Sequence, residues 1–259
     1  MIKAIFLDID GTLVSFKTHR IPQSTIDAIS NVRRQGVKVF IATGRPLPFV
    51  NNLEGLEYDG IMTVNGACCQ TGDGTVLRHD SIDRDDLARL VAYCQTHPFP
   101  VAFASNDDVF MTESSVESEE IFELLNLDAP RVAPISECLD MDVMQIIGFF
   151  DANEENVLMK DVLLDCAAQR WHPLFADVIR RGNNKAQGID TILDYYGIGL
   201  GEAMAFGDGG NDMEMLKHVR YGVAMGNARD EVKKVAHYVT QSVDNDGIAL
   251  ALQKFIGLK

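Results

Sequence analysis

The chain has 259 residues, a formal net charge of −15 and a hydrophobic content of 46%. This hydrophobic content is sufficient for a large packed core, so a disordered chain is excluded. Because sequence-independent nucleic-acid binding depends on basic surfaces, the acidic composition also excludes a nucleic-acid partner of that kind.

The apolar segments are strand-sized, and none approaches the roughly 20 residues of a membrane span. An aspartate at position 8 interrupts the N-terminal apolar run too early for a secretory signal. We therefore expect a cytoplasmic protein with no membrane partner. The five cysteines are odd in number and include no CxxC pair, which favours reduced, mostly buried thiols.

The first part of the chain alternates short apolar strands with helices. Residues 2–7 and 37–42 are predicted strands, and the apolar spacing between them predicts a helix over 22–35. A short helix is expected after the second strand, and a third strand spans 60–64. Such strands, joined by helices, are typical of a parallel sheet with helices on both faces.

The middle of the chain has a different pattern, in which helices and strands do not alternate regularly. It begins after a predicted hairpin turn at 72–74. The predicted elements are a helix over 83–96, strands over 101–105 and 109–112, a helix over 116–125, a strand over 144–150, a helix over 154–169 and a strand over 176–180. This α+β pattern indicates an inserted domain at residues 82–182.

After residue 182 the alternating pattern returns. The predicted elements are a helix over 185–196, a strand over 203–206, a helix through Met215, a strand over 221–225, a helix over 230–236, a strand over 237–240 and a helix from 247. The predicted fold is therefore α/β. It has a Rossmann-like doubly wound parallel sheet core, formed by residues 1–81 and 183–259, that carries the inserted α+β domain.

Two carboxylates stand where the first predicted strand ends, in Asp8-Ile9-Asp10-Gly11. Alternation along an extended chain sends Asp8 and Asp10 to the same side. Such a pair is costly unless a cation, a proton or chemistry compensates it.

Other polar groups also follow apolar strands or open a helix. Thr43-Gly44 and Asp208–Asp212 follow strands, and Lys185 opens a helix. Because ligands bind at the carboxyl ends of strands in an open α/β sheet, these groups are expected to converge. Carboxylates and carbonyls suit Mg²⁺ better than zinc, and the hydroxyl, ammonium and amide donors suit a phosphate. The combination indicates phosphoryl transfer, in which one carboxylate attacks phosphorus and a second moves protons.

These segments resemble the motifs of the haloacid dehalogenase-like phosphatases, in the Cof-type branch with a type IIB cap. Asp-Ile-Asp-Gly-Thr-Leu at 8–13 matches the first motif, Ala-Thr-Gly-Arg at 42–45 the second, Lys185 the third and Gly-Asp-Gly-Gly-Asn-Asp at 207–212 the fourth. Asn65-Gly66-Ala67 also fits this branch. The motifs occur in order over nearly the whole chain, with the insertion between the second and third.

The resemblance implies that Asp8 is the nucleophile and Asp10 the general acid and base. It also implies a Mg²⁺ cofactor held by the Asp8 carboxylate, the Asp10 backbone carbonyl and Asp208. The remaining implied roles are phosphate binding by Thr43, Gly44, Lys185 and Asn211, and orientation of Lys185 or a metal-bound water by Asp212.

The resemblance further implies that residues 82–182 form a cap that sets substrate specificity. His172, Asp177 and Arg180 lie near the return to the core and are candidate substrate contacts. Arg45 is a candidate contact at the rim of the site, although an ordinary surface charge is the favoured interpretation.

Taken singly, the segments have ordinary explanations. Asp8–Gly11 is compatible with a plain turn, whereas an EF-hand calcium loop fails because its twelfth position is His19 rather than glutamate. Thr43-Gly44 is compatible with a helix N-cap, and Lys185 with a solvated lysine in a first turn.

The sequence therefore predicts a Mg²⁺-dependent phosphatase that acts on small phosphorylated metabolites, with sugar phosphates expected first. A phosphomutase is one alternative, and a non-catalytic metabolite-binding protein on the same scaffold is another. The expected partner is a small phosphate ester, and the expected assembly is a monomer or a weak homodimer.

Overall fold

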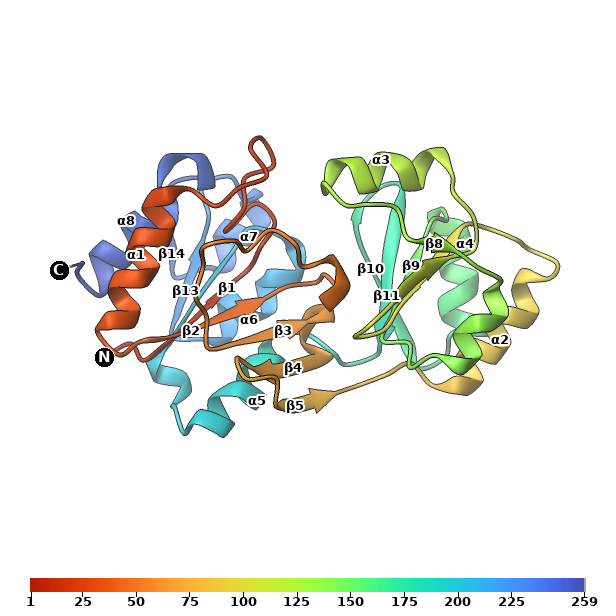
Figure 1. Cartoon of the computed structure of the whole chain (residues 1–259), viewed down its shortest axis with the longest axis horizontal. Coiled ribbons are helices and arrows are strands. Elements are labelled where there is room, and N and C mark those ends of the chain that lie inside the picture. The colour runs from red at the N-terminus through yellow and green to blue at the C-terminus, as the bar shows by residue number, and fades with distance from the viewer. Residues whose placement is uncertain (259) are drawn as a thin grey trace. The chain divides into compact units, whose positions relative to one another are not determined.

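The structure, a computed structural model, describes residues 1–258, apart from the side chain of Trp171. It divides into two compact units (Figure 1). The core unit comprises residues 1–45, 50–79 and the chain from residue 184 onward, and the inserted unit comprises residues 46–49 and 80–183. Among the described residues, no helix combines the length and the apolar character needed to cross a membrane.

The segment Pro46–Phe49 differs from the sequence-based division, which assigned it to the core. It forms a short 3₁₀ helix at Leu47–Phe49, and the Phe49 ring lies 5.9 Å from the Phe122 ring in an edge-to-face arrangement. This contact joins the segment to a hydrophobic cluster of the inserted unit.

The core unit is built on an eight-stranded sheet in the order β14-β13-β12-β1-β2-β3-β4-β5. Neighbours from β14 to β3 pair in parallel, and β4 and β5 add an antiparallel hairpin at one edge. The strands are β1 Ala4–Leu7, β2 Lys38–Ala42, β3 Gly60–Thr63, β4 Cys68–Thr71, β5 Val76–His79, β12 Ala203–Gly207, β13 Tyr221–Ala224 and β14 Tyr238–Val239.

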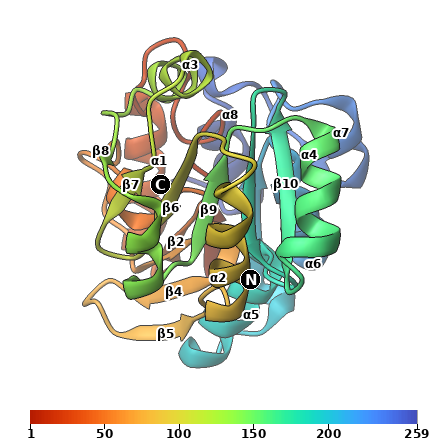
Figure 2. The ribbon, with the colours of Figure 1, turned by 90° about the vertical axis from the view of Figure 1, so that its right-hand side faces the viewer.

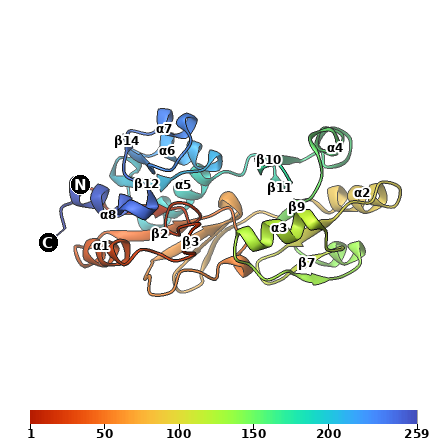
Figure 3. The same ribbon diagram turned by 90° about the horizontal axis from the view of Figure 1, so that it is seen from above.

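Helices cover both faces of this sheet (Figure 3). On one face, apolar side chains of α5, α6 and α7 pack with Phe6, Phe40 and Ala205 of the sheet, while α1 and α8 pack against each other on the opposite side. The helices are α1 Gln23–Arg34, α5 Lys185–Tyr196, α6 Met213–His218, α7 Asp230–Val235 and α8 Gly247–Phe255, with 3₁₀ turns at Val64–Gly66, Leu200–Glu202, Gly210–Asp212 and Val243–Asn245. The predicted α/β core is confirmed.

The inserted unit has a six-stranded sheet in the order β10-β11-β9-β6-β7-β8, in which only β7 and β8 pair in parallel. Helix α2 and the helical segment that begins with α4 cover one face, over Phe103, Ile146 and Val178 (Figure 2). Helix α3 packs on the cluster of the other face. The elements are α2 Arg84–Cys94, β6 Val101–Ala104, β7 Val109–Met111, α3 Val116–Leu124, β8 Arg131–Val132, a 3₁₀ turn at Ile135–Asp140, β9 Gln145–Gly148, α4 Ala152–Val157, β10 Cys166–His172 and β11 Phe175–Arg180.

The prediction of one helix over 154–169 is wrong. Helix α4 ends at Val157, a π-helical stretch follows at Leu158–Val162, and the chain then enters β10. The buried Asp86 carboxylate accepts the backbone N–H groups of Leu164 and Asp165 at 3.1 and 3.0 Å. These long-range bonds end the helix, and pairing with β11 outweighs the local helix propensity.

All five cysteines are free thiols, and four of them are buried. This confirms the expectation drawn from their number and spacing.

Candidate active site

The first motif forms a tight turn directly after β1. The Asp8 N–H donates to the Phe206 carbonyl at 3.2 Å, which ties the end of β1 to β12. Gly11 has a φ of +81°, and a Cβ on it would lie 2.3 Å from Asp208 Oδ2. Only glycine fits there, because the backbone is left-handed and the Asp208 carboxylate packs directly on it.

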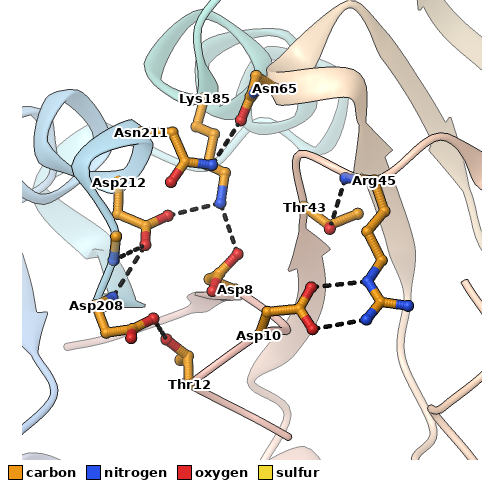
Figure 4. A network of polar contacts seen from close by, with 11 residues as sticks. Asp8, Asp10, Thr12, Thr43, Arg45, Asn65, Lys185, Asp208, Asn211 and Asp212 are labelled. Atoms are coloured by element: carbon orange, nitrogen blue, oxygen red, sulfur yellow. Dashed lines mark hydrogen bonds and ion pairs between the residues drawn. The ribbon is translucent and has the colours of Figure 1, made fainter. Parts of the chain in front are cut away.

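Lys185 is fully buried, and its ammonium joins two carboxylates (Figure 4). Its Nζ lies 2.7 Å from Asp8 Oδ1 and 2.6 Å from Asp212 Oδ1. The Asn184 side chain accepts the Gln187 N–H at 3.0 Å, so α5 begins at Lys185 and places it toward the site. The interpretation of Lys185 as a solvated surface lysine is therefore wrong.

Asp212 holds the loop that follows β12. Its Oδ2 accepts the N–H groups of Asp208 and Gly209 at 3.0 and 2.9 Å, while its Oδ1 accepts from Lys185. A Cβ on Gly207 would lie 2.4 Å from the Asp212 Cβ, so the observed loop conformation requires glycine at position 207. Both Asp212 oxygens are thus engaged, and this carboxylate orients Lys185 and the loop together.

Asp208 is held from two sides. The Thr12 hydroxyl donates to Asp208 Oδ1 at 3.1 Å, and Asn227 Nδ2 donates to Asp208 Oδ2 at 3.0 Å. The same Asn227 nitrogen lies 2.8 Å from the Gly11 carbonyl, and its oxygen accepts the Val243 N–H at 3.0 Å. Sequence reasoning missed Asn227, although its position just beyond β13, at the same edge of the sheet, was the available signal.

The second motif lies beside the Asp10 carboxylate. Arg45 is 7% exposed, and its Nε and Nη2 each lie 2.7 Å from an Asp10 oxygen, in a bidentate pair. The interpretation of Arg45 as an ordinary surface charge is therefore wrong, because its guanidinium is directed inward. The Thr43 hydroxyl oxygen accepts the Arg45 backbone N–H at 3.0 Å.

Thr43, Gly44 and Asn211 meet at the next part of the site. A Cβ on Gly44 would lie 3.2 to 3.3 Å from the amide atoms of Asn65 and Asn211, so this loop packs closely on both. Asn211 Nδ2 donates to Asn65 Oδ1 at 2.9 Å. Sequence analysis placed no function on Asn65, although it noted the Asn-Gly segment after the third strand.

The carboxylates near Lys185 outnumber its single charge. Burial, with the charge of Asp212 next in size, raises the pKa of Asp8 well above its usual range although Lys185 opposes the shift. Burial and Asp212 likewise raise the pKa of Asp208 to about 7. Burial lowers the pKa of the Lys185 ammonium, but the charges and hydrogen bonds of Asp212 and Asp8 outweigh it and the net shift is upward.

This excess of negative charge fits a cation. One oxygen from each of Asp8, Asp208 and Asp212 lies within 4.8 Å of the others. An all-oxygen donor set suits a hard divalent ion, and bound positive charge would favour the ionised form of Asp8 and Asp208. Asp212 Oδ1 accepts from the charged Lys185 ammonium and its Oδ2 accepts from two backbone N–H groups, whereas each Asp208 oxygen accepts from one neutral side chain. Asp8 and Asp208 are therefore the carboxylates best suited to hold the ion.

The three candidate contacts of the inserted unit lie on its last two strands. Asp177 is 8% exposed and sits opposite Ile147 of β9. Arg180 is exposed, with Nη1 3.9 Å from Asp80 Oδ1, and alternation along β11 puts it on the face opposite Asp177. The His172 ring, at the end of β10, stacks on the Phe175 ring at 6.3 Å. The structure therefore does not gather these residues on one face.

Comparison with known proteins gives a consistent result. The family model for haloacid dehalogenase-like hydrolases matches residues 5–252. The chain is 33% identical to the putative phosphatase YkrA of Bacillus subtilis strain 168 over 99% of both chains, and 31% identical to the 5-amino-6-(5-phospho-D-ribitylamino)uracil phosphatase YitU of the same strain over 98% of this chain and 97% of that one. Among solved structures, a sugar phosphatase of subclass IIB is 40% identical, with a TM-score of 0.90 over 99% of this chain and 100% of that one.

The raised pKa of Asp208 predicts how stability depends on pH in metal-free protein. The folded state keeps the Asp208 proton up to a pH of about 7, whereas the unfolded chain releases it near 3.8, so stability falls as the pH rises through this window. Asp208→Asn removes this dependence. Its free energy of unfolding relative to the wild type should rise by roughly 2 kcal/mol between pH 5 and 7.5, measured by urea unfolding in EDTA.

Any fixed effect of the altered hydrogen bonds cancels, because only the change with pH is compared. The exposed Asp194, substituted to asparagine, serves as the control and should follow the wild-type curve. Parallel curves for wild type and Asp208→Asn would show that the site does not hold this proton.

Proposed function

Because this chain belongs to the haloacid dehalogenase-like hydrolase family and is a phosphatase, we propose that it hydrolyses small phosphate monoesters through a phosphoryl intermediate on Asp8. The observation that carries the proposal is the buried contact between Asp8 and Lys185. Asp8 also lies two residues before Asp10 in the sequence, so a second carboxylate is close by along the chain. A nucleophile, a fixed cation and a second carboxylate are thus supplied by one edge of the core sheet.

In the first step, an Asp8 carboxylate oxygen attacks phosphorus. The bond between phosphorus and the ester oxygen breaks as the new bond forms. The departing alkoxide takes a proton from the Asp10 carboxyl group and is released as the alcohol, and Asp10 becomes a carboxylate. Lys185 lies against Asp8 and is suited to stabilise negative charge on the transferring group.

In the second step, the Asp10 carboxylate takes a proton from water as the water oxygen attacks phosphorus. The bond between phosphorus and Asp8 breaks, orthophosphate leaves, and both aspartates return to their starting forms. The bidentate pair with Arg45 supports proton transfer by orienting the Asp10 carboxyl group.

We assign the phosphate oxygens to the donors around Gly44. The Thr43 hydroxyl, the Gly44 backbone N–H, the Lys185 ammonium and the Asn211 amide come from three segments that meet at one place in the core unit. Charge-assisted hydrogen bonds of this kind are short and strong, and they position the phosphoryl group for attack.

The proposed cofactor is Mg²⁺, held by the Asp8 and Asp208 carboxylates and the Asp10 backbone carbonyl. Bound there, the ion would neutralise negative charge on the phosphoryl group. Asp212 is assigned to the orientation of Lys185, in agreement with its occupied oxygens.

The proposed substrates are small phosphorylated metabolites, with sugar phosphates first. Similarity to a subclass IIB sugar phosphatase and to a phosphatase of a phosphorylated ribitylamino compound supports this class. We propose that the inserted unit is the cap that selects among them. His172, Asp177 and Arg180 stay its candidate contacts, but Asp177 and Arg180 lie on opposite faces of β11, so one of these two at most would contact the substrate. The relative YitU and the similar subclass IIB structure are both named as phosphatases, which favours transfer to water over the phosphomutase alternative and over a non-catalytic binding protein.

Asp8→Asn should lose activity at least about a thousandfold in turnover, because an amide cannot take its place as the nucleophile. The measurement is orthophosphate release from p-nitrophenyl phosphate with Mg²⁺, and EDTA should abolish the wild-type rate until Mg²⁺ is restored. Asp194→Asn, an exposed substitution, is the matched control. Equal turnover by Asp8→Asn and the wild type would refute the mechanism, and undiminished activity in EDTA would refute the metal requirement.

A panel of phosphate esters should identify the substrate class. Hexose and pentose phosphates should give kcat/KM values of about 10⁴ M⁻¹s⁻¹ or more, the range of ordinary enzymes, and should exceed nucleotides and phosphorylated amino acids. Orthophosphate and the dephosphorylated sugar should appear in equal amounts. An isomerised sugar phosphate without orthophosphate would instead establish a phosphomutase.

A substitution of Arg45 tests whether this residue orients Asp10 or contacts the substrate directly. Arg45→Lys keeps the charge but loses the bidentate geometry, so kcat should fall about tenfold or more with KM changed little. Steady-state kinetics on p-nitrophenyl phosphate measure the split, with the exposed Arg34→Lys as control. A raised KM at unchanged kcat would assign Arg45 to substrate binding instead.

A further inference from the structure

The turn after β3 has an unusual backbone. Val64, Asn65 and Gly66 have φ values of +50°, +51° and +89°. A positive φ is rare for any residue other than glycine and is a marked outlier for a β-branched residue such as Val64. Consecutive strained residues persist only where the surrounding structure forces them, and they concentrate at functional sites.

Backbone hydrogen bonds tie this turn to the second motif. The Val64 N–H donates to the Arg45 carbonyl at 3.1 Å, and the Asn65 N–H donates to the Thr43 carbonyl at 3.0 Å. The turn therefore fixes the backbone on both sides of Gly44, whose N–H is one of the assigned phosphate donors.

The same turn touches the start of α5. A Cβ on Gly66 would lie 2.6 Å from the Asn184 carbonyl oxygen, and a Cβ on Gly188 would lie 3.1 Å from the Gly66 Cα. Two glycines thus let the turn pack directly on the helix end that carries Lys185. One short segment, absent from the proposed chemistry, therefore contacts two of the segments that carry phosphate donors.

The Asn65 side chain reaches the third such segment. It is 2% exposed, and its Oδ1 accepts the Asn211 Nδ2–H at 2.9 Å (Figure 4). This bond takes one of the two N–H groups of the Asn211 amide and fixes which way the amide faces. The second N–H group is then available as a donor.

We propose that Asn65 is a positioning residue for phosphate binding, which orients the Asn211 amide so that its nitrogen, and not its oxygen, faces the phosphate. The positive φ of the turn is what brings Asn65 Oδ1 to Asn211. The proposal rests on the assignment of Asn211 to the phosphate under the proposed function.

Two substitutions at position 65 separate the side chain from the backbone strain. Asn65→Gly deletes the amide and tolerates a positive φ, whereas Asn65→Ala deletes the amide and keeps the strain. Each should raise the inhibition constant of inorganic phosphate about tenfold, as expected for a misplaced charge-assisted hydrogen bond. Asn65→Ala should melt at a lower temperature than Asn65→Gly, while the two inhibition constants agree.

A double-mutant cycle with Asn211→Ala then tests the route of the effect. If Asn65 acts through Asn211, the Asn65→Gly/Asn211→Ala double variant should bind phosphate as weakly as Asn211→Ala alone. The measurement is competitive inhibition by inorganic phosphate against p-nitrophenyl phosphate, with melting temperatures recorded for every variant.

Three outcomes would overturn the proposal. Fold-changes that multiply in the double variant would show that the two residues act independently. Phosphate inhibition unchanged in Asn65→Gly but weakened in Asn65→Ala would assign the effect to backbone strain alone. Unchanged phosphate inhibition in Asn211→Ala, with Asp8→Asn inactive, would remove Asn211 from the phosphate site and leave the rest of the proposed function standing.

Discussion

The buried ammonium of Lys185 between Asp8 and Asp212 is the interaction on which the rest of the site depends. These three residues belong to the end of β1, the start of α5 and the loop after β12. A charge taken out of water requires a close partner, and the loss of Lys185 would leave the Asp8 and Asp212 carboxylates without a positive partner in this contact. The three segments are therefore held together by the same groups to which the proposed chemistry is assigned.

Glycines make that convergence sterically feasible. The Asp208 carboxylate packs directly on the backbone of Gly11, and the absence of a side chain at Gly207 leaves room for Asp212. Gly66 and Gly188 allow the turn after β3 to pack on α5. Because the ligand-binding groups must lie within hydrogen-bond reach of one another, the backbones that carry them approach more closely than side chains would permit. The carboxylates of the site outnumber its ammonium group, so the site carries excess negative charge. A bound metal ion would offset this charge.

Most of the fold followed from local patterns, and the failures have a common cause. The periodicity of 185–196 predicted α5 with its observed bounds, and the apolar runs predicted the six parallel strands of the core sheet but not the edge strands β4 and β5. The helix expected over 154–169 failed because Asp86, far away in the sequence, captures two backbone N–H groups at its end. Arg45 was expected on the surface because nothing in its neighbours along the chain reveals that Asp10 lies within reach. Asn227 belongs to no motif, and Asn65 was matched only as part of Asn65-Gly66-Ala67, so the role of each follows from the residues that it contacts.

The sequence by itself determined the alternation of strands and helices, the family and the candidate reactive groups, since each depends on residue type and spacing along the chain. Only the tertiary structure decided the burial of Lys185, the bidentate partner of Asp10, the loss of the helix before β10 and the strained turn at Val64–Gly66. Each of these features depends on contacts between residues many positions apart in the sequence, and the energies of those contacts depend on distance and desolvation. Residue order alone does not encode those quantities, which arise when the sheet brings the ends of its strands to one edge.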